Sequence, residues 1–260
     1  MKSCEKKWLV IFSGQDSPAM NMALDSIMWE RARKNPDIAI LRFYAWVPPA
    51  VSLGAGQLPE KLVNVDFCQH HGIPIVRRVT GGSAIFHDIE ITYSFSSVND
   101  EVFPGPSASY EKICEAISTG VKNLGVQLSF RGLSTGREPS FTSRDCFSLS
   151  SRYDLVAGGR KFVGSAQRKD KNSFLQHGSI LLNIRKHFWQ GIFIQRPDFE
   201  KISCLSDFVM VPLIDVILEQ LAAGFEEYFG TKFTPDGFTR QEIDGARKLA
   251  PSFLLSCQKV

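Results

Sequence analysis

The chain has 260 residues, of which 43% are hydrophobic and 11% aromatic, so it can bury a full core without disulfides or metals. Thirty Lys and Arg against 27 Asp and Glu leave a net charge of +3, which is too even for a general nucleic-acid binder. No apolar run approaches the roughly 20 residues that span a bilayer, and residues 1–14 lack a signal-peptide cleavage pattern. We therefore expect a cytosolic protein with free thiols, because its six cysteines show no paired spacing.

The first part of the chain alternates between strand and helix patterns. Apolar runs and helical spacing predict strands at 8–13, 38–46 and 50–53 and helices at 19–34 and 60–71. Residues 73–97 are rich in β-branched and aromatic residues between turn signals, which indicates strands on both sides of a TGGS turn. A helix is then predicted over 107–124, with Ser109 as a possible cap and Gly125 as its end.

The second part begins with a long loop and ends in helices. Residues 131–151 show no periodicity, and long loops of this kind are disproportionately functional or disordered. A second β block follows over 153–184, with turns at 158–159 and 170–172. Helices are predicted at 213–229, before Gly230, and at 240–249, where Thr239 and Glu242 have capping-box spacing. We expect one catalytic domain over 1–260, with residues 207–260 as its C-terminal helical portion.

The block RRVTGGSAIFHD, residues 77–88, places two glycines between strand-like segments beside two arginines. Consecutive glycines let backbone amides approach an anion or a carbonyl without a Cβ in the way. Because adjacent side chains of a strand point to opposite faces, only Arg77 or Arg78 should face a pocket. From the residues alone, a hairpin turn with two solvated arginines is equally compatible with this pattern.

A second block, GRKFVGSAQRK, covers residues 159–169 and is followed by QHGSILLN. Small residues at 164–166 permit a substrate or another backbone to come close, whereas a lone Lys161 is more often an ordinary surface lysine. His177 and His87 are interpreted as hydrogen-bonded supporting residues rather than bases. His70 and His71 are adjacent in sequence, which is poor geometry for joint metal ligation, and no metal site is predicted.

Cys146 lies in the long loop between the two blocks. An unperturbed thiol is only a few per cent ionised at neutral pH, so a cysteine nucleophile needs a neighbouring positive charge. Arg144 and Arg152 flank Cys146 in sequence, and Lys161 could face it across a hairpin. From the residues alone, Cys146 is either a nucleophile or one of six unremarkable thiols.

Together, these blocks closely resemble the biotin/lipoate protein ligase A/B superfamily in their order and spacing. NMALDSIMWE and AVSLGAGQ are also similar to it, so the resemblance covers about residues 8–230. Ligases typically have a third glycine where this chain has Ser83, whereas ITYS at 91–94 and a cysteine before a YDL strand resemble the octanoyltransferases of lipoate assembly. The implied fold is α+β, with a central mixed, largely antiparallel sheet flanked by helices, of the class II aminoacyl-tRNA-synthetase-like type.

The resemblance also implies a function. An octanoyl group would move from the phosphopantetheine thioester of acyl carrier protein to a lysine of a lipoyl domain, such as glycine cleavage H protein, without ATP or another cofactor. Cys146 would be the nucleophile, and Lys161 would lower the pKa of its thiol. Arg168, Lys169 and Lys171 would steer acidic carriers. The residues implied to line the acyl pocket or to supply oxyanion donors are Arg78, Thr80, Gly81, Gly82, Ser83, Ala84, Ile85, Phe86, His87, Gly164, Ser165, Ala166 and His177.

Three other functions stay open at this stage. The first is a lipoate-protein ligase that uses ATP and magnesium, in which Lys161 contacts an acyl adenylate and Cys146 is incidental. The second is an amidotransferase that moves lipoyl or octanoyl groups between lipoyl domains with the same Cys/Lys chemistry. The third is a non-enzymatic binding module for lipoyl domains or nucleic acid. Because the charge is nearly balanced, neither nucleic acid nor a membrane is an expected partner.

Overall fold

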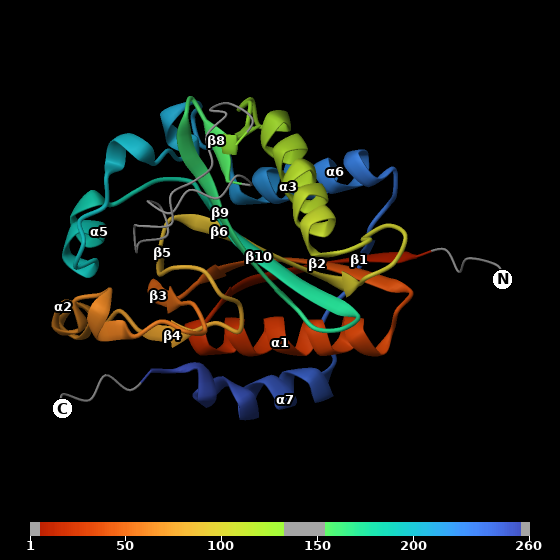
Figure 1. Ribbon diagram of the computed structural model, residues 1–260, viewed down its shortest axis with the longest axis horizontal. Coiled ribbons are helices and arrows are strands. Elements are labelled where there is room, and N and C mark those ends of the chain that lie inside the picture. The colour runs from red at the N-terminus through yellow and green to blue at the C-terminus, as the bar shows by residue number, and fades with distance from the viewer. Residues whose placement is uncertain (1–5, 133–153, 256–260) are drawn as a thin grey trace.

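The computed structural model describes residues 6–132 and 154–255, which form a large mixed sheet with helices on both faces (Figure 1). In this part of the chain the sheet order is β11-β1-β2-β6-β10-β9-β8-β7. β1 is parallel to both of its neighbours, and the other pairs are antiparallel. The strands are β1 (Lys7–Asp16), β2 (Ile38–Trp46), β6 (Glu90–Val98), β7 (Ser129–Phe130), β8 (Leu155–Ala157), β9 (Arg160–Lys169), β10 (Ser173–Leu181) and β11 (Thr234–Pro235).

A second, three-stranded sheet stands beside the large one and has the order β4-β3-β5. β3 (Ala50–Leu53) is parallel to β4 (Ile75–Arg77) and antiparallel to β5 (Ile85–His87). Because β3 lies between β4 and β5, the TGGS segment joins two strands that are not neighbours. The alternative of a hairpin turn at TGGS is therefore wrong.

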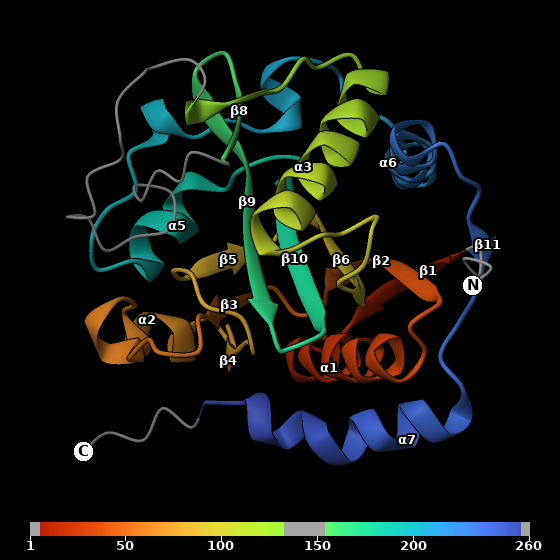
Figure 2. The same ribbon diagram turned by 45° about the vertical axis from the view of Figure 1, so that its right-hand side comes forward.

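The helices cover the two faces of the large sheet unequally. α3 and α6 lie on one face, and α1 lies on the other with α7 on its outer side (Figure 2). α2 and α5 pack together at the small sheet. The helices are α1 (Pro18–Lys34), α2 (Val65–His70), α3 (Pro106–Asn123), α5 (Lys186–Ile192), α6 (Ile214–Phe229) and α7 (Arg240–Leu249), with short 3-10 turns η1 (Pro59–Lys61), η2 (Phe199–Lys201), η3 (Leu205–Asp207) and η4 (Ala250–Phe253).

The face under α3 and α6 is filled with aromatic rings. Phe95 on β6 has the rings of Phe103, Phe174 and Phe225 around it, with centroids 5.4 to 6.1 Å away. The two helices cross with their backbones in contact, because a Cβ added at position 224 would lie 2.2 Å from the backbone nitrogen of Gly120. Only glycine fits such a close approach. This face is a stable core against which the strands of the site are fixed.

The C-terminal segment returns to the small sheet. After α7 has packed along α1, Leu254 forms a bridge with Val76 of β4, and the Leu255 N–H donates to the Ile75 carbonyl at 3.0 Å. The last described residues thus lie on the edge of β4 opposite β3.

The predicted fold class is confirmed, and most predicted elements lie within a few residues of the observed ones. Thr239 and Glu242 form the expected capping box, and Gly230 ends α6 in the left-handed conformation. The predicted cap at Ser109 is wrong, because α3 begins one residue after Gly105 and the Ser109 hydroxyl bonds to the Pro106 carbonyl instead. Within residues 6–132 and 154–255, no helix combines the length and apolar character that crossing a bilayer requires.

Candidate functional site

A small cavity lies between β5, α1 and the middle of β10. Of the predicted site residues, Arg78, Ile85, His87, Ala166 and His177 line this cavity. The rest of its wall comes from α1, β2, β3, β6 and β10, as Met22, Tyr44, Trp46, Ser52, Thr92, Gly178 and Ser179. Its volume is about 20 Å³, which is room for about one water molecule.

Arg78 organises the glycine-rich segment. Its guanidinium donates to the carbonyls of Gly81 and Ser83 at 2.9 and 2.7 Å, and also to Ser52 and to Thr80. These are five hydrogen bonds for the five N–H groups that a guanidinium carries. Arg78 is buried, whereas Arg77 is partly exposed and bonds to loop carbonyls, so one arginine of the pair faces the cavity.

His177 links the cavity to a buried ion pair beneath it. Its Nε2 lies 2.6 Å from the Thr80 hydroxyl, and its Nδ1 lies 3.0 Å from one carboxylate oxygen of Asp25 on α1. The other Asp25 oxygen accepts from Arg42 at 2.8 Å, and Tyr44 donates to the same carboxylate. The result is a hydroxyl, an imidazole and a carboxylate in series.

A second hydroxyl, imidazole and carboxylate lie in series at His87, but here His87 Nδ1 has no hydrogen-bond partner in the described residues. The Ser52 hydroxyl lies 2.8 Å from His87 Nε2, and His87 Nδ1 faces a carboxylate oxygen of Glu90 at 3.4 Å. The His87 ring stacks on Trp46 with centroids 4.0 Å apart. Thr92 donates to the same Glu90 oxygen at 2.6 Å. Both histidines, predicted as supporting residues, lie in the cavity wall itself.

Burial and charge set the ionisation of these groups. Burial alone would raise the pKa of the Asp25 carboxyl, but the hydrogen bond from His177 and the charge of Arg42 outweigh it, so this pKa lies below its usual range. Burial lowers the pKa of His87; Glu90 opposes this effect, and the charge of Arg78 adds to it. We therefore describe Asp25 as ionised and His87 as neutral at pH 7.

Lys161 is a buried lysine and not an ordinary surface one. It lies near the start of β9, and its Nζ is 3.0 Å from an oxygen of Asp154. Both side chains are 4% exposed. Lys161 does not line the small cavity. Breaking a buried pair by removal of one partner leaves an uncompensated charge, so the ion pair with Asp154 holds Lys161 in place.

Strand alternation separates the predicted site residues into two groups. Ala84 and Phe86 pack on the far side of β5, in a cluster with Leu53 and Trp189, whereas Ile85 and His87 line the cavity. Ser165 likewise points away from the cavity, since its hydroxyl accepts from Tyr93 at 2.7 Å on the α3 side of the sheet. Gly164 is buried in β9, and Gly81 and Gly82 are exposed on the segment above the cavity.

Cys146, the predicted nucleophile, lies outside the described residues, together with Arg144 and Arg152. Cys68, Cys114 and Cys204 are buried and form no disulfide with one another. Burial is also the main cause of the raised pKa of the Cys114 thiol, which makes it a poor nucleophile.

Several functional residues were missed by reasoning from the sequence alone. Asp25 and Asp154 carry the two buried ion pairs, and Ser179 adds a hydroxyl to the cavity wall. Asp25 gave a usable signal, because a carboxylate between Met22 and Met28 falls among the buried residues of the helix. Ser179 lies within the apolar run SILL, and nothing in the sequence there indicated a functional role.

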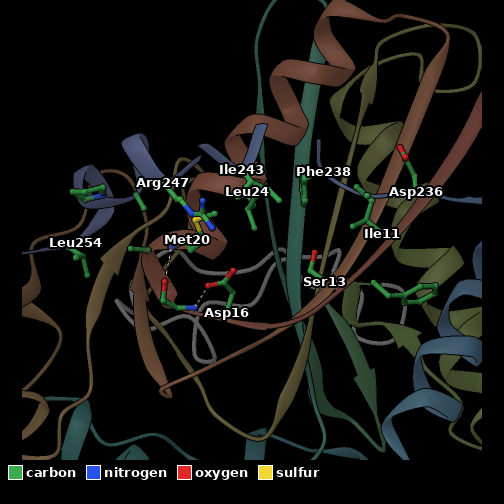
Figure 3. Close-up of a pocket in the computed structure, with 16 residues that line it drawn as sticks. Ile11, Ser13, Asp16, Met20, Leu24, Asp236, Phe238, Ile243, Arg247 and Leu254 are labelled. Carbon is green, nitrogen blue, oxygen red and sulfur yellow. Dashed lines mark hydrogen bonds between the residues drawn. The ribbon is translucent and has the colours of Figure 1, made fainter. Parts of the chain in front are cut away.

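A larger groove lies away from these residues. It has a volume of about 700 Å³ and runs between β1, α1 and the segment 236–254 (Figure 3). Its wall includes Ile11, Met20 and Ile243, and none of the predicted site residues lines it. Within residues 6–132 and 154–255, no group of three or more His, Cys, Asp or Glu side chains could hold a metal ion.

Solved structures that share this fold are described as lipoate-protein ligases. Among solved structures, lipoate-protein ligase A bound with ATP aligns with a TM-score of 0.78 at 26% identity, over 95% of this chain and 94% of that one. The protein Ta0514 of T. acidophilum with bound lipoic acid aligns at 0.76 and 25% identity, over 95% of each chain.

Sequence comparison identifies the family. The lipoyl protein ligase A/B catalytic domain matches residues 17–222, and the chain belongs to this family. Octanoyltransferase LipM of Bacillus subtilis (strain 168) is 32% identical over 265 residues, covering 95% of each protein. Octanoyltransferase LipM of Moorella thermoacetica is 30% identical over 259 residues, again with 95% of each covered. The resemblance to this superfamily is thereby confirmed.

Proposed function

We propose that this chain is an octanoyltransferase. It takes an octanoyl group from the phosphopantetheine thioester of acyl carrier protein and places it on a lysine of a lipoyl domain, such as that of glycine cleavage H protein, through a thioester on Cys146. The observation that carries this proposal is the buried Lys161–Asp154 ion pair, which begins eight residues after Cys146 in the chain. The octanoyltransferase relatives, which align over nearly their whole length, support it.

In the first step, the Cys146 thiolate attacks the thioester carbonyl of the donor. The new carbon–sulfur bond forms as the bond to phosphopantetheine breaks, and the phosphopantetheine thiol leaves with the proton. The ammonium of Lys161 favours the thiolate and stabilises charge on the carbonyl oxygen. In the second step, the neutral amine of the acceptor lysine attacks the acyl-enzyme carbonyl. The carbon–nitrogen bond forms as the bond to the Cys146 sulfur breaks, Cys146 leaves as a thiolate, and the proton that the nitrogen loses passes to water. The acyl group arrives as an activated thioester, so neither reaction step needs ATP.

The cavity between Arg78 and His177 is the site we assign to the acyl chain. Apolar groups of Met22, Ile85 and Ala166 line it, which suits a saturated chain. Because its volume is about 20 Å³, an eight-carbon chain enters only when the walls separate. The segment 80–83 joins the lining residues Arg78 and Ile85 and carries two exposed glycines, so we expect it to move when the chain enters.

The test is incubation with octanoyl acyl carrier protein in the absence of ATP, followed by intact-protein mass spectrometry. We expect the wild-type enzyme to gain one octanoyl group and to pass it to a lipoyl domain. Cys146→Ala should gain none, and Lys161→Ala should form the adduct on the order of 10²-fold more slowly. Cys114→Ala is the matched control and should acylate normally, since its buried thiol is a poor nucleophile.

The similarity to lipoate-protein ligase A makes an ATP-dependent ligase the second candidate. A ligase would retain activity in Cys146→Ala and would require ATP and magnesium for acyl transfer. An amidotransferase would instead take its acyl group from an octanoylated lipoyl domain and not from acyl carrier protein. Either outcome contradicts the proposed function.

A further inference from the structure

Eight polar side chains line the acyl cavity, and seven of them are engaged with other side chains through the contacts described above. The exception is Ser179 on β10. Its hydroxyl oxygen is buried and has no hydrogen-bond partner in the described part of the chain. Burial of an unsatisfied hydroxyl costs stability, so an atom of this kind calls for an explanation.

Arg78 fixes where the neighbouring hydroxyl protons point. A guanidinium has only donors, so the oxygens of Ser52 and Thr80 accept from it. The hydrogen of each hydroxyl is then left for the imidazole beside it, on His87 or His177. These two protons therefore serve the wall and not a bound molecule. Among the hydroxyl groups of the lining, Ser179 is left as the donor that a ligand can use.

The register of the sheet locates Ser179 relative to the proposed chemistry. On β9, His177 faces Ala166, whereas Ser179 faces Gly164, three positions from Lys161. Ser179 is thus the cavity residue of β10 nearest in register to Lys161. Gly164 has no side chain, so none projects from the position that pairs with Ser179.

We propose that the Ser179 hydroxyl donates a hydrogen bond to the carbonyl oxygen of the bound octanoyl thioester. This inference rests on the proposed octanoyl transfer. An octanoyl chain carries one strong hydrogen-bond acceptor, its carbonyl, and this lining offers one unengaged hydroxyl donor. The complementarity sets how deep the chain enters, because the apolar tail must lie along Ile85 and Ala166 while the carbonyl stays at Ser179.

The hydrogen bond also acts during the reaction. When the Cys146 thiolate adds to the carbonyl carbon, the electron pair of the C=O bond moves to the oxygen, and it returns as the carbon–sulfur bond to the leaving thiol breaks. The proton stays on Ser179 throughout. A donor aimed at an oxygen that gains negative charge binds the transition state more tightly than the ground state. Ser179 is in this sense a catalytic residue.

Ser94 supplies the matched control for a Ser179→Ala variant. It lies on the neighbouring strand β6, its buried hydroxyl also has no hydrogen-bond partner in residues 6–132 or 154–255, and it does not line the cavity. Removal of an unsatisfied buried hydroxyl should leave the melting temperature unchanged or raise it in both Ser179→Ala and Ser94→Ala. Only Ser179→Ala should lose kcat/KM for octanoyl transfer, by on the order of 10²-fold.

Infrared spectroscopy of the octanoyl-enzyme made with a 13C-labelled carbonyl gives a second readout. In Ser179→Ala the labelled carbonyl band should shift to higher frequency, because the bond loses its hydrogen-bond donor, whereas Ser94→Ala should match the wild type. Equal kcat/KM values in the two variants, or an unshifted band, would overturn the role of Ser179. Failure of the wild-type enzyme to form any octanoyl thioester would instead overturn the proposed function.

Discussion

The two faces of the large sheet are built on different principles. Under α3 and α6, aromatic rings such as those of Phe95 and Phe174 pack against helices that touch through Gly120 and Gly224. Under α1, the corresponding layer holds a buried Arg42–Asp25 ion pair and the histidines of the cavity. Apolar packing stabilises the fold through contacts that have no preferred direction. The hydrogen bonds of the polar layer are directional, and they fix where each proton lies. Variants that disturb one face should therefore differ in kind from those that disturb the other.

The largest effect is expected from Arg42→Met on the α1 side. Removal of the guanidinium leaves the Asp25 carboxylate buried without its cation, which should cost about 3–5 kcal/mol of unfolding free energy. Octanoyl transfer should fall as well, because Asp25 orients His177. Urea denaturation and activity per folded molecule measure the two losses. Arg33→Met is the control, since its partly exposed pair with Glu30 should contribute about 1 kcal/mol or less.

A smaller effect is expected from Gly224→Ala between α3 and α6. The new Cβ would lie 2.2 Å from the Gly120 backbone nitrogen, so the helices must separate, at about 1–3 kcal/mol. In contrast to Arg42→Met, kcat/KM per folded molecule should not change. Gly237→Ala, where a Cβ meets nothing within 4 Å, should leave the melting temperature nearly unchanged. A loss of donor affinity in Gly224→Ala would show that the two faces are not independent.

The smallest effect is the dependence of stability on pH through His87. Burial lowers its pKa in the folded state, so below the unfolded value of about 6.5 the unfolded chain takes up a proton before the folded one does. The stability that neutral His87 contributes is complete above that pH and is lost as pH falls toward the folded pKa. The slope from this group is at most about 1.4 kcal/mol per pH unit. Between pH 7 and 5, the unfolding free energy from denaturation curves should fall less steeply with pH in His87→Gln than in the wild type. Equal slopes in the two proteins would contradict the lowered pKa of His87.

Local patterns predicted the elements but not their polar partners. Helical spacing located α3 and α6, and Gly230 marked an end, because these signals act within a few residues. The position of β3 between β4 and β5 depends on pairing across the chain, so the TGGS segment was open to interpretation as a hairpin. Period-2 alternation could have separated Ile85 from Phe86, but only the fold shows which face borders the cavity.

The ion pairs were hidden for a similar reason. Asp25 meets Arg42 and His177 across separations of 17 and 152 residues, and no local rule couples such positions. The resemblance to a family supplied Lys161, and the fold supplied Asp154 as its partner.

The bridge between Leu254 and Val76 has a consequence for the order of synthesis. β4 leaves the ribosome early, together with the two arginines that follow Val76, but one of its edges stays open until Leu254 has been made. An open strand edge can pair with other chains. During translation, the glycine-rich segment therefore follows a strand, β4, whose free edge becomes hydrogen-bonded only when Leu254 and Leu255 pair with it. A chain that stops after α6 would have every strand of the large sheet except β11, and this edge of β4 would still be exposed.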